Sequence, residues 1–261
     1  MPEGDVVWYT ARRLHDALAD RTLTHSDFRV PRLATADLTG DMVTETASRG
    51  KHLLIRTRGG LTVHTHLRMD GSWRVTRAAE PVKDGHRIRL ILANDTWRAT
   101  GYQLGVVELL RTRDEQRVVG HLGPDLLGPD WDPDEAVRRL RAQPARPIAE
   151  ALMDQRNLAG IGNLYKAEVL FLRGIDPWTP AGDVPDLPEV VELARRLLNA
   201  NKERVGQVIT GNANRGEQTW VYGRRGRPCR RCGTSIRSMG QQDRVTYWCP
   251  ACQGAGPPGA G

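Results

Sequence analysis

Four cysteines near the end of the chain restrict its fold more than any other feature of the sequence. They form two Cys-x-x-Cys pairs, Cys229 with Cys232 and Cys249 with Cys252, and 16 residues separate the pairs. Four thiolates at this spacing suit a tetrahedral zinc ion held at the ends of two hairpin knuckles. We therefore predict one zinc ion rather than a redox pair or free thiols. Because sulfur would fill all four positions, the zinc would be structural and not catalytic.

The segment around the cysteines is basic, and we predict that the zinc holds part of it as a hairpin. It carries Arg230, Arg231, Arg237 and Arg244, with Tyr247 and Trp248 on the following strand. Arginines on a rigid hairpin suit phosphate binding. A solvated basic face is the alternative, and it stays open for Arg230 and Arg231.

The overall charge points to the same class of partner. The net charge is +7 and the pI about 9.6, which favours a polyanion, nucleic acid before an anionic membrane. No run of about 18 apolar residues occurs, so no membrane span is expected. The N-terminus carries Glu3 and Asp5 and lacks the apolar region of a signal peptide, so we expect a cytoplasmic protein. In that compartment paired cysteines indicate a metal before a disulfide.

The first half of the chain is predicted to contain one helix followed by β-strands. A spacing of 4, 3 and 4 residues, as on one face of a helix, relates Val7, Ala11, Leu14 and Leu18. Short alternating segments then fill residues 22–112, and two of them flank Gly59-Gly60, a hairpin signal. The expected strands cover residues 52–58, 61–67, 72–77, 86–93 and 105–112. Several short strands with glycine-containing turns indicate an antiparallel sandwich or barrel.

The second half is predicted to be mainly helical after a Pro/Gly-rich connection at residues 122–130. Asp132-Pro133-Asp134-Glu135 combines a cap residue, a proline at the first helical position and a glutamate three residues on. Asp186 and Glu189 repeat this arrangement ahead of a second apolar pattern. We also expect helices at 147–155 and 163–173, a mobile loop at 202–226 and disorder in the Gly/Pro/Ala-rich tail from Gln253.

The first residues form a second candidate site. Pro2 is too small to protect Met1 from removal, so we expect a chain that begins with a secondary amine. An α-amino group titrates near pH ~8, so part of it is unprotonated at neutral pH and can form a Schiff base. Glu3 lies beside it and could transfer protons. A polar N-terminus that leads into a helix is the alternative, and the motif alone favours that alternative.

Three further motifs each have a functional and a structural interpretation. Gly160-Ile161-Gly162-Asn163 allows close backbone approach and opens a helix, so it could bind phosphate or be an ordinary helical hairpin that Asn163 caps. Lys51 precedes a strand and could be solvated, or could hold phosphate and shuttle protons. Met69 follows a strand and could be core, or could be a wedge between bases. His64 and His66 alternate with apolar residues and need not be ligands.

Taken together, these motifs resemble the formamidopyrimidine-DNA glycosylase/endonuclease VIII family, and the resemblance runs from Pro2 to Gln253. The matching segments are Pro2-Glu3-Gly4, Arg49-Gly50-Lys51, His66-Leu67-x-Met69-x-Gly71-x-Trp73, Leu122-Gly-Pro-Asp125, Leu158-Ala-Gly-Ile-Gly-Asn163 and the four cysteines. Single motifs are weakly specific, but their conjunction in this order is highly specific, and it reverses the interpretation of Pro2.

The resemblance implies an α+β fold. An N-terminal antiparallel β-sandwich with a leading helix would precede a helical domain with a helix-two-turn-helix and a zinc-finger hairpin with four cysteine ligands. The expected limits are 1–121 for the catalytic sandwich, 122–130 for a linker, 131–222 for the helical domain, 223–253 for the zinc finger and 254–261 for a disordered tail.

The resemblance also implies a function, that of a base-excision-repair DNA glycosylase. The enzyme would remove oxidised bases, mainly pyrimidines, and cleave the abasic site by β,δ-elimination through a Schiff base on Pro2. Catalysis would involve Pro2, Glu3, Lys51 and Arg244, and DNA binding would involve Arg68, Met69, Asn163 and His121. The implied partner is damaged DNA, double- or single-stranded, and the protein would act as a monomer in the bacterial nucleoid.

Several positions depart from the family patterns and leave alternatives open. Val6 stands where the endonuclease VIII branch often has Glu, and His121 stands where an arginine can precede Leu-Gly-Pro-Asp. Arg68 and Asp70 differ from the wedge residues of some relatives. Gly4 follows Glu3, and residues 97–103 lack the Arg-Arg-Phe-Gly wedge of the guanine-lesion branch, so both favour the endonuclease VIII branch. The alternatives are oxidised purines (8-oxoguanine and formamidopyrimidines) as substrates, or a zinc-ribbon DNA-binding protein without catalysis.

Overall fold

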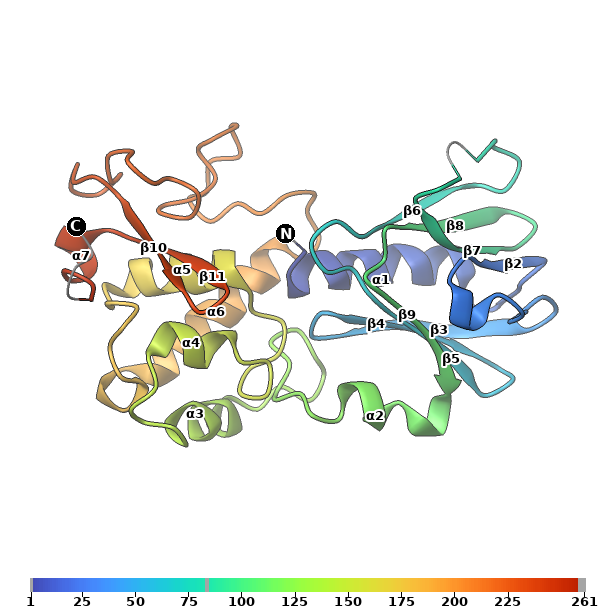
Figure 1. Cartoon of the computed structure of the whole chain (residues 1–261), viewed down its shortest axis with the longest axis horizontal. Coiled ribbons are helices and arrows are strands. Elements are labelled where there is room, and N and C mark those ends of the chain that lie inside the picture. Colours follow the sequence, from blue (N-terminus) through green and yellow to red (C-terminus); the bar gives the residue numbers. More distant parts are fainter. Residues whose placement is uncertain (1, 83–84, 258–261) are drawn as a thin grey trace. The chain divides into compact units, whose positions relative to one another are not determined.

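The computed structural model describes residues 2–82 and 85–257 and separates into two units between His121 and Leu122 (Figure 1). The Pro/Gly-rich segment found in the sequence begins at that boundary. None of the described helices combines the length and the apolar character needed to cross a membrane.

Helix α1 (Gly4–Leu18) is the first element of unit 1 and closes its core. The positions that the 4-3-4 spacing predicted to face inward are all buried: Val7, Ala11, Leu14 and Leu18. They pack in one cluster with side chains from two different sheets, among them Leu53 and Val63 of one and Leu90 and Leu92 of the other. Burial of each leucine contributes about 1.5–3 kcal/mol, so this packing holds the helix in place.

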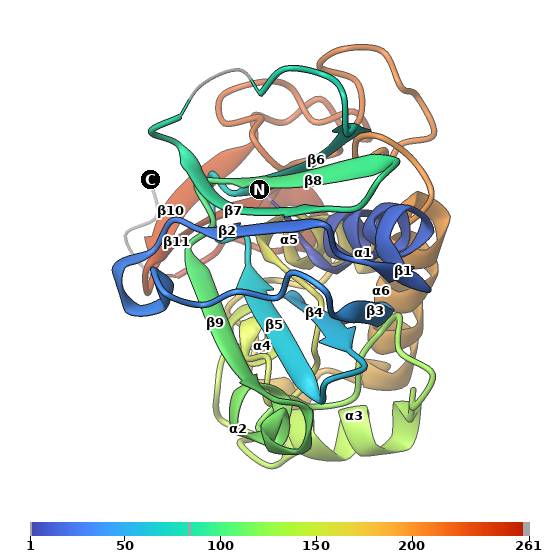
Figure 2. The same cartoon turned by 90° about the vertical axis from the view of Figure 1, so that its right-hand side faces the viewer.

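Two antiparallel sheets form the layers of unit 1, as Figure 2 shows. The five-stranded sheet has the order β1 (Arg21–Thr22), β3 (Met42–Arg49), β4 (His52–Thr57), β5 (Leu61–His66), β9 (Val106–Arg111). The four-stranded sheet has the order β2 (His25–Phe28), β7 (Ile88–Ala93), β8 (Trp97–Tyr102), β6 (Ser72–Arg77). The α+β class with a β-sandwich and a leading helix is therefore confirmed.

Polar side chains occupy the face of the five-stranded sheet that turns away from this core. Arg56 donates two hydrogen bonds of 2.8 Å to the carboxylate of Glu115, and the hydroxyl of Thr62 donates a third at 2.7 Å. Glu115 lies between the short helices η2 (Thr112–Asp114) and α2 (Gln116–Val119). This network ties the last segment of unit 1 to its sheet, up to the unit boundary.

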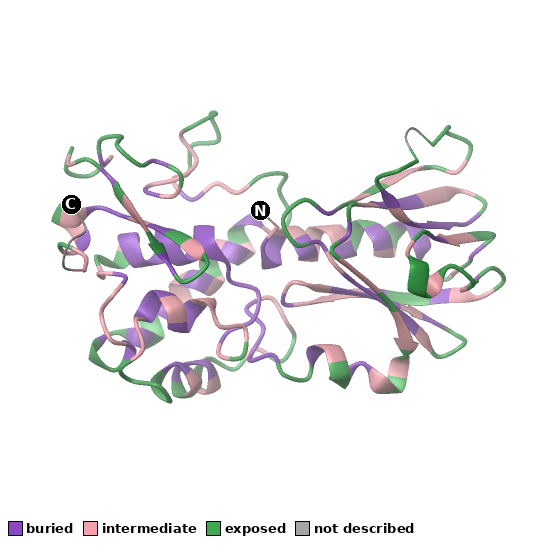
Figure 3. Cartoon of the chain, in the orientation of Figure 1, coloured by how far each residue is buried: buried purple, intermediate pink, exposed green. Residues whose placement is uncertain are grey.

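Unit 2 is built on α5 (Asn163–Arg173), which is buried from Asn163 to Phe171 and purple over most of its length in Figure 3. Around it lie α3 (Pro133–Arg141), α4 (Ile148–Met153), η3 (Ala181–Asp183) and α6 (Leu187–Asn201). The finger hairpin, β10 (Arg237–Gln241) and β11 (Arg244–Trp248), and α7 (Pro250–Gln253) complete the unit. Ala167 and Phe171 of α5 share an apolar cluster with Cys229 and Cys249, so the finger packs directly on this helix.

Residues 202–226, which the sequence predicted as a mobile loop, contain no helix or strand but are anchored to the neighbouring elements, most firmly by Glu168 of α5. The buried carboxylate of Glu168 accepts hydrogen bonds from the backbone N–H groups of Trp220, Val221 and Tyr222 at 2.7–2.9 Å. Burial raises the pKa of Glu168 more than these three donors lower it. The segment that leads into the finger is therefore fixed to the middle of α5.

Three local predictions need correction. Asp132 caps α3 by accepting a hydrogen bond from the Glu135 N–H at 3.0 Å, but the side chain of Asp186 makes no cap bond to α6 and instead pairs with Arg173. Residues 97–102, compared above with a loop motif, form the interior strand β8, which the sequence pattern did not reveal. Gln253 is buried, so the tail does not start there. Residues 258–261 lie outside the described part.

We predict that Asp132→Ala lowers the free energy of unfolding of unit 2 by about 1 kcal/mol, because the helix loses its side-chain cap. Asp186→Ala is the matched control, since it removes the same group from a helix start where no cap bond exists. Its exposed ion pair should contribute less than about 0.5 kcal/mol. Urea unfolding of the full chain measures both, and equal losses would contradict the assignment of the cap.

Candidate functional site

The N-terminal residues of unit 1 are held by the packed helix that follows them. Pro2 is half-buried and directly precedes Glu3, the N-cap residue of α1, whose backbone carbonyl accepts the Val7 N–H at 3.0 Å. The side chain of Glu3 is fully buried, and Asp5 in the first turn is only 2% exposed. Since α1 is locked into the core, both Pro2 and Glu3 have a fixed place. Met1 lies outside the described residues.

Lys51 lies in the tight turn between β3 and β4 rather than in a strand. Gly50 adopts a φ of 56°, a conformation that favours glycine and lets the chain reverse before Lys51. This turn and the connection between β5 and β6 reach the same end of unit 1 as the start of α1 (Figure 1). Three segments with predicted site residues therefore come together at one end of the sandwich.

The connection between β5 and β6 presents Met69 to solvent. Its side chain is 53% exposed, so the structure rules out the core position that the sequence left open. Arg68 has a φ of 56°, and its backbone N–H donates to Nδ1 of His66 at 3.0 Å. A Cβ atom at Gly71 would lie 2.3 Å from the carbonyl oxygen of Leu67, so only glycine fits this turn. The loop therefore has a defined shape with Arg68 and Met69 outward.

A chain of imidazoles lies beside these segments, and sequence reasoning missed it. Nδ1 of His52 and Nε2 of His64 are 2.8 Å apart, and Nδ1 of His64 is 2.9 Å from a carboxylate oxygen of Glu108. The rings of His66 and His121 lie edge-on to His52, with centroids 5.0 and 6.1 Å away. Because a carboxylate only accepts, His64 donates from Nδ1, and His52 in turn donates to His64.

Two of these histidines, His52 and His66, are neutral at physiological pH. Burial, followed by the charges of the neighbouring histidines and Arg68, lowers the pKa of His52 to about 3. Burial, followed by the charges of Arg68 and Lys51, lowers the pKa of His66 to about 4. The alternation of His64 and His66 was the signal available in the sequence. The pairing of β4 with β5 brings His52 beside them, and the sequence alone does not show this pairing.

In unit 2, Asn163 is the first residue of α5, and Gly162 takes the cap position. The structure therefore excludes the alternative in which Asn163 caps the helix. Its Nδ2 donates to the carbonyl oxygen of Val245 on β11 at 2.9 Å, so the connector is tied to the finger hairpin. Gly160 has a φ of 98°, which the sharp entry into the helix requires.

The four cysteines fit a zinc ion. Their Sγ atoms all lie within 4.8 Å of one another, and Cys232 is 3.5 Å from both Cys249 and Cys252. Tetrahedral zinc with sulfur at about 2.3 Å places ligand atoms about 3.8 Å apart. The geometry agrees with the predicted structural zinc, which these four cysteines would hold.

The arginines of the finger fall into two groups. Arg230 pairs with Glu217 and donates to the carbonyl oxygens of Thr219 and Gly216, and Arg231 stacks over the ring of Phe171 at 4.6 Å. Both therefore stabilise the unit itself. Arg244 lies at the start of β11, beside the turn at the hairpin tip, and pairs with its neighbour Asp243 at 3.6 Å.

Comparison with known families accounts for most of the chain. The family sequence models that match are the formamidopyrimidine-DNA glycosylase N-terminal domain at residues 1–104, the formamidopyrimidine-DNA glycosylase H2TH domain at residues 122–207, and the zinc finger found in FPG and IleRS at residues 226–254.

Individual relatives resemble the chain over nearly its full length. It is 58% identical to a Streptomyces coelicolor protein named probable endonuclease 8 2, over 98% of this chain and 95% of that protein. It is 49% identical to a Mycolicibacterium smegmatis protein named DNA-(apurinic or apyrimidinic site) lyase Nei2, over 98% and 100%. The crystal structure of Lactococcus lactis formamido-pyrimidine DNA glycosylase with AP-site DNA shares the fold, with a TM-score of 0.82, 24% identity and coverage of 96% and 99%.

We predict that acid destabilises the protein through His52. Its pKa is about 3 in the folded chain and near 6.5 when unfolded, so the unfolded state takes up the extra proton as pH falls below 6.5. The contribution of His52 to the free energy of unfolding is therefore fully present above pH ~6.5. It decreases by about 1 kcal/mol per pH unit toward pH ~3, a slope reduced from the ideal value because the ring is partly exposed. His52→Phe should flatten this slope in urea unfolding between pH 6.5 and 5.

His25→Gln is the control, because His25 is exposed on β2 and outside the histidine chain. It should keep the wild-type slope. If His52→Phe and His25→Gln give the same pH dependence, the buried histidine is not its cause.

Proposed function

The chain belongs to the formamidopyrimidine-DNA glycosylase/endonuclease VIII family, as its motifs predicted, and we propose that it is a bifunctional DNA glycosylase and abasic-site lyase of base-excision repair. The observation that carries the proposal is the near-full-length identity of 58% and 49% to proteins named for endonuclease 8 and abasic-site lyase. The proposed substrates are oxidised bases in DNA, mainly pyrimidines, and the proposed strand cleavage is β,δ-elimination.

Pro2 is the proposed nucleophile. After Met1 is removed, its nitrogen attacks C1′ of the damaged nucleotide, the glycosidic bond breaks, and the base leaves with a proton. Opening of the sugar ring gives an iminium, which acidifies C2′. Loss of a C2′ proton and cleavage of the C3′–O bond release the 3′ phosphate. A second elimination releases the 5′ phosphate, and hydrolysis then frees Pro2. Glu3 gives and accepts protons, and Lys51 assists this transfer and holds phosphate.

The structure supports these roles in unit 1 by the way it holds the residues. An amine on a mobile terminus could not keep a reacting geometry, whereas Pro2 precedes a helix that both sheets bury. The exposed Met69 suits a side chain that fills the space of a base flipped out of the duplex. Arg68 and His121 are exposed and can contact the DNA backbone.

The remaining proposed contacts come from unit 2, where Asn163 and Arg244 bind backbone phosphate and Arg244 also supports δ-elimination. The partner is damaged DNA, double- or single-stranded, and the protein acts as a monomer in the bacterial nucleoid. The proposed limits remain 1–121 for the catalytic domain, 122–130 for the linker, 131–222 for the helical domain and 223–253 for the finger.

Two alternatives have distinct signatures. The same chemistry on 8-oxoguanine and formamidopyrimidines would appear as a reversed preference in a nicking assay over a panel of lesions. The names of the 58% and 49% relatives and the absence of the Arg-Arg-Phe-Gly motif favour pyrimidines. A zinc-ribbon protein that only binds DNA would form no covalent intermediate and would not need a free Pro2 amine.

We predict that borohydride traps the protein covalently on DNA with an abasic site. A tag that leaves the Pro2 nitrogen in a peptide bond should reduce the adduct to background, because an amide nitrogen cannot form a Schiff base. Pro2→Gly keeps an α-amine, now a primary one on a more flexible residue, so the yield should fall less than with the tag. Gel separation of the trapped complex measures the yield.

Pro31→Gly is the matched control, since Pro31 is an exposed proline in the short helix η1 (Pro31–Leu33). It should trap like the unaltered chain. A full yield of adduct from the tagged protein would rule out Pro2 as the nucleophile.

We predict that Met69→Ala slows excision of a damaged base by about tenfold, because the vacated space in the duplex is no longer filled. Cleavage of DNA that already carries an abasic site should change by less than about twofold. Val82→Ala, a truncation of another exposed apolar side chain in unit 1, is the control. Equal losses on both substrates would show that Met69 acts in some way other than as a wedge.

A further inference from the structure

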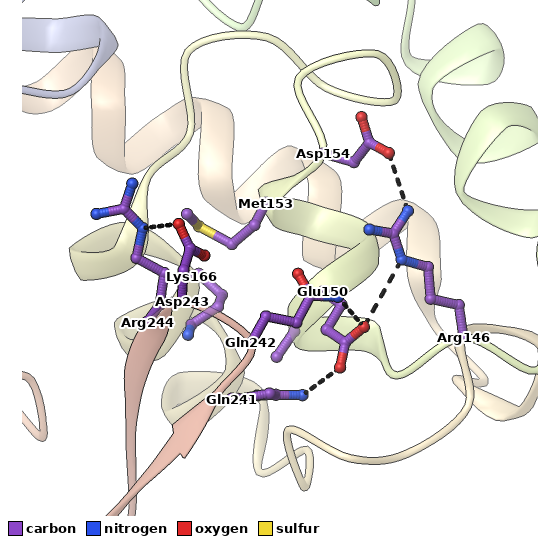
Figure 4. Close-up of a pocket in the computed structure, with 10 residues that line it drawn as sticks. Arg146, Glu150, Met153, Asp154, Lys166, Gln241, Gln242, Asp243 and Arg244 are labelled. Atoms are coloured by element: carbon purple, nitrogen blue, oxygen red, sulfur yellow. Dashed lines mark hydrogen bonds and ion pairs between the residues drawn. The ribbon is translucent and has the colours of Figure 1, made fainter. Parts of the chain in front are cut away.

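A pocket of about 230 Å³ lies between α4, α5 and the tip of the finger hairpin. Figure 4 shows that charged and amide side chains from all three elements converge on it. The hairpin tip that borders the pocket carries Arg244, for which the family resemblance implies a role. The contacts around this tip indicate what holds Arg244 in place.

The tip is a two-residue turn whose backbone conformation is unfavourable for the residue that adopts it. Gln241 pairs with Arg244 across the hairpin, so Gln242 and Asp243 form the turn. Gln242 has a φ of 53°, in the left-handed region that two-residue hairpin turns require and that glycine or asparagine usually supplies. A glutamine in this conformation has a cost of about 1 kcal/mol, so other contacts have to stabilise the turn.

Glu150 of α4 provides contacts of this kind. One of its carboxylate oxygens accepts a hydrogen bond from Nε2 of Gln242 at 2.5 Å, and the other accepts one from Nε2 of Gln241 at 3.3 Å (Figure 4). Both amides belong to the tip, so a single carboxylate bridges its two neighbouring residues. Nε of Arg146 lies 3.9 Å from the same carboxylate, and Nη1 of Arg146 donates to Asp154 at 2.9 Å, so the charge of Glu150 faces a guanidinium.

Lys166 of α5 holds the tip from the other side of the hairpin. Its side chain is almost completely buried, and Nζ donates to the hydroxyl of Thr246 at 2.8 Å. That hydroxyl donates to Oε1 of Gln241 at 2.8 Å. The amide of Gln241 thus accepts from Thr246 and donates to Glu150, and one hydrogen-bonded chain runs from α5 through the hairpin to α4.

We propose that Glu150 and Lys166 are positioning residues that fix the β10–β11 turn and thereby aim Arg244 at a DNA phosphate, an inference that rests on the proposed function. Arg244 and Asp243 form an ion pair whose side chains are 37% and 80% exposed, and such a pair contributes little to stability. Arg244 directly follows the turn, so the position of its backbone depends on the conformation of the turn. Glu150 and Lys166 hold that conformation through their hydrogen bonds.

The test uses the full-length zinc-loaded protein with two variants and two measurements. Glu150→Ala removes the acceptor for both amides. Gln242→Gly removes the hydrogen bond from this side chain to Glu150, but it places at the turn the residue that its positive φ favours. Amide hydrogen exchange at residues 241–245 reports the turn, and the ratio of δ- to β-elimination products on abasic DNA reports the aim of Arg244. Glu189→Ala, an exposed glutamate of α6, has the same change of charge and is the control.

We expect Glu150→Ala to speed exchange at the turn about tenfold and to lower the product ratio roughly fivefold, while Glu189→Ala changes neither. Gln242→Gly should lower the ratio in the same direction despite its easier backbone. Lys166→Met should speed exchange and lower the product ratio as Glu150→Ala does. Lys166→Arg keeps a donor, so its exchange and product ratio should lie closer to those of the unaltered protein.

Two results would overturn the inference. Wild-type exchange and product ratio in Glu150→Ala, or a raised ratio in Gln242→Gly, would show that the turn holds itself. If the unaltered protein neither traps nor nicks abasic DNA, the proposed function fails, and the assignment of Arg244 fails with it. Faster exchange in Glu150→Ala would still establish the hydrogen-bonded support, so the two failures are distinguishable.

Discussion

Unit 1 depends on the burial of one face of α1 against two sheets at once. A helix that packed on a single sheet could slide or tilt, but the leucines of α1 share a cluster with side chains from both layers. The residues just before this helix are therefore as fixed as the core itself. Pro2, the proposed nucleophile, therefore has the defined position that a covalent reaction needs.

In unit 2, helix α5 holds the neighbouring segments in place, and it does so through polar as well as apolar contacts. Ala167 and Phe171 pack on the cysteine-bearing finger, and Glu168 holds the segment that leads into it. Asn163 and Lys166 reach the second strand of the hairpin. The zinc ion fixes the base of the finger, whereas these side chains fix its far end. A small hairpin is thus held at both ends.

Several buried carboxylates and imidazoles in the two units join segments that are remote in sequence. The carboxylate of Glu115 joins a strand to the last segment of unit 1, and that of Glu168 joins a helix to a loop. His52, His64 and Glu108 form a hydrogen-bonded chain that joins three neighbouring strands. A chain with a net charge of +7 benefits from this arrangement, because neutral imidazoles beside Arg68 and Lys51 add no further positive charge until acid protonates them.

The sequence by itself determined the features that depend on local spacing. The helical face of Val7 and Leu14, the zinc ligands and the first residue of α5 all follow from short-range patterns, and the order of motifs determined the family. It did not reveal β8, the cap that Asp186 fails to make, or the contacts of Glu150. Each of these involves groups far apart in the chain, such as Glu150 and Gln242, and no local pattern records which strands pair or which side chains meet. Only the tertiary structure decides these contacts, because it alone sets the distances between segments that are remote in sequence.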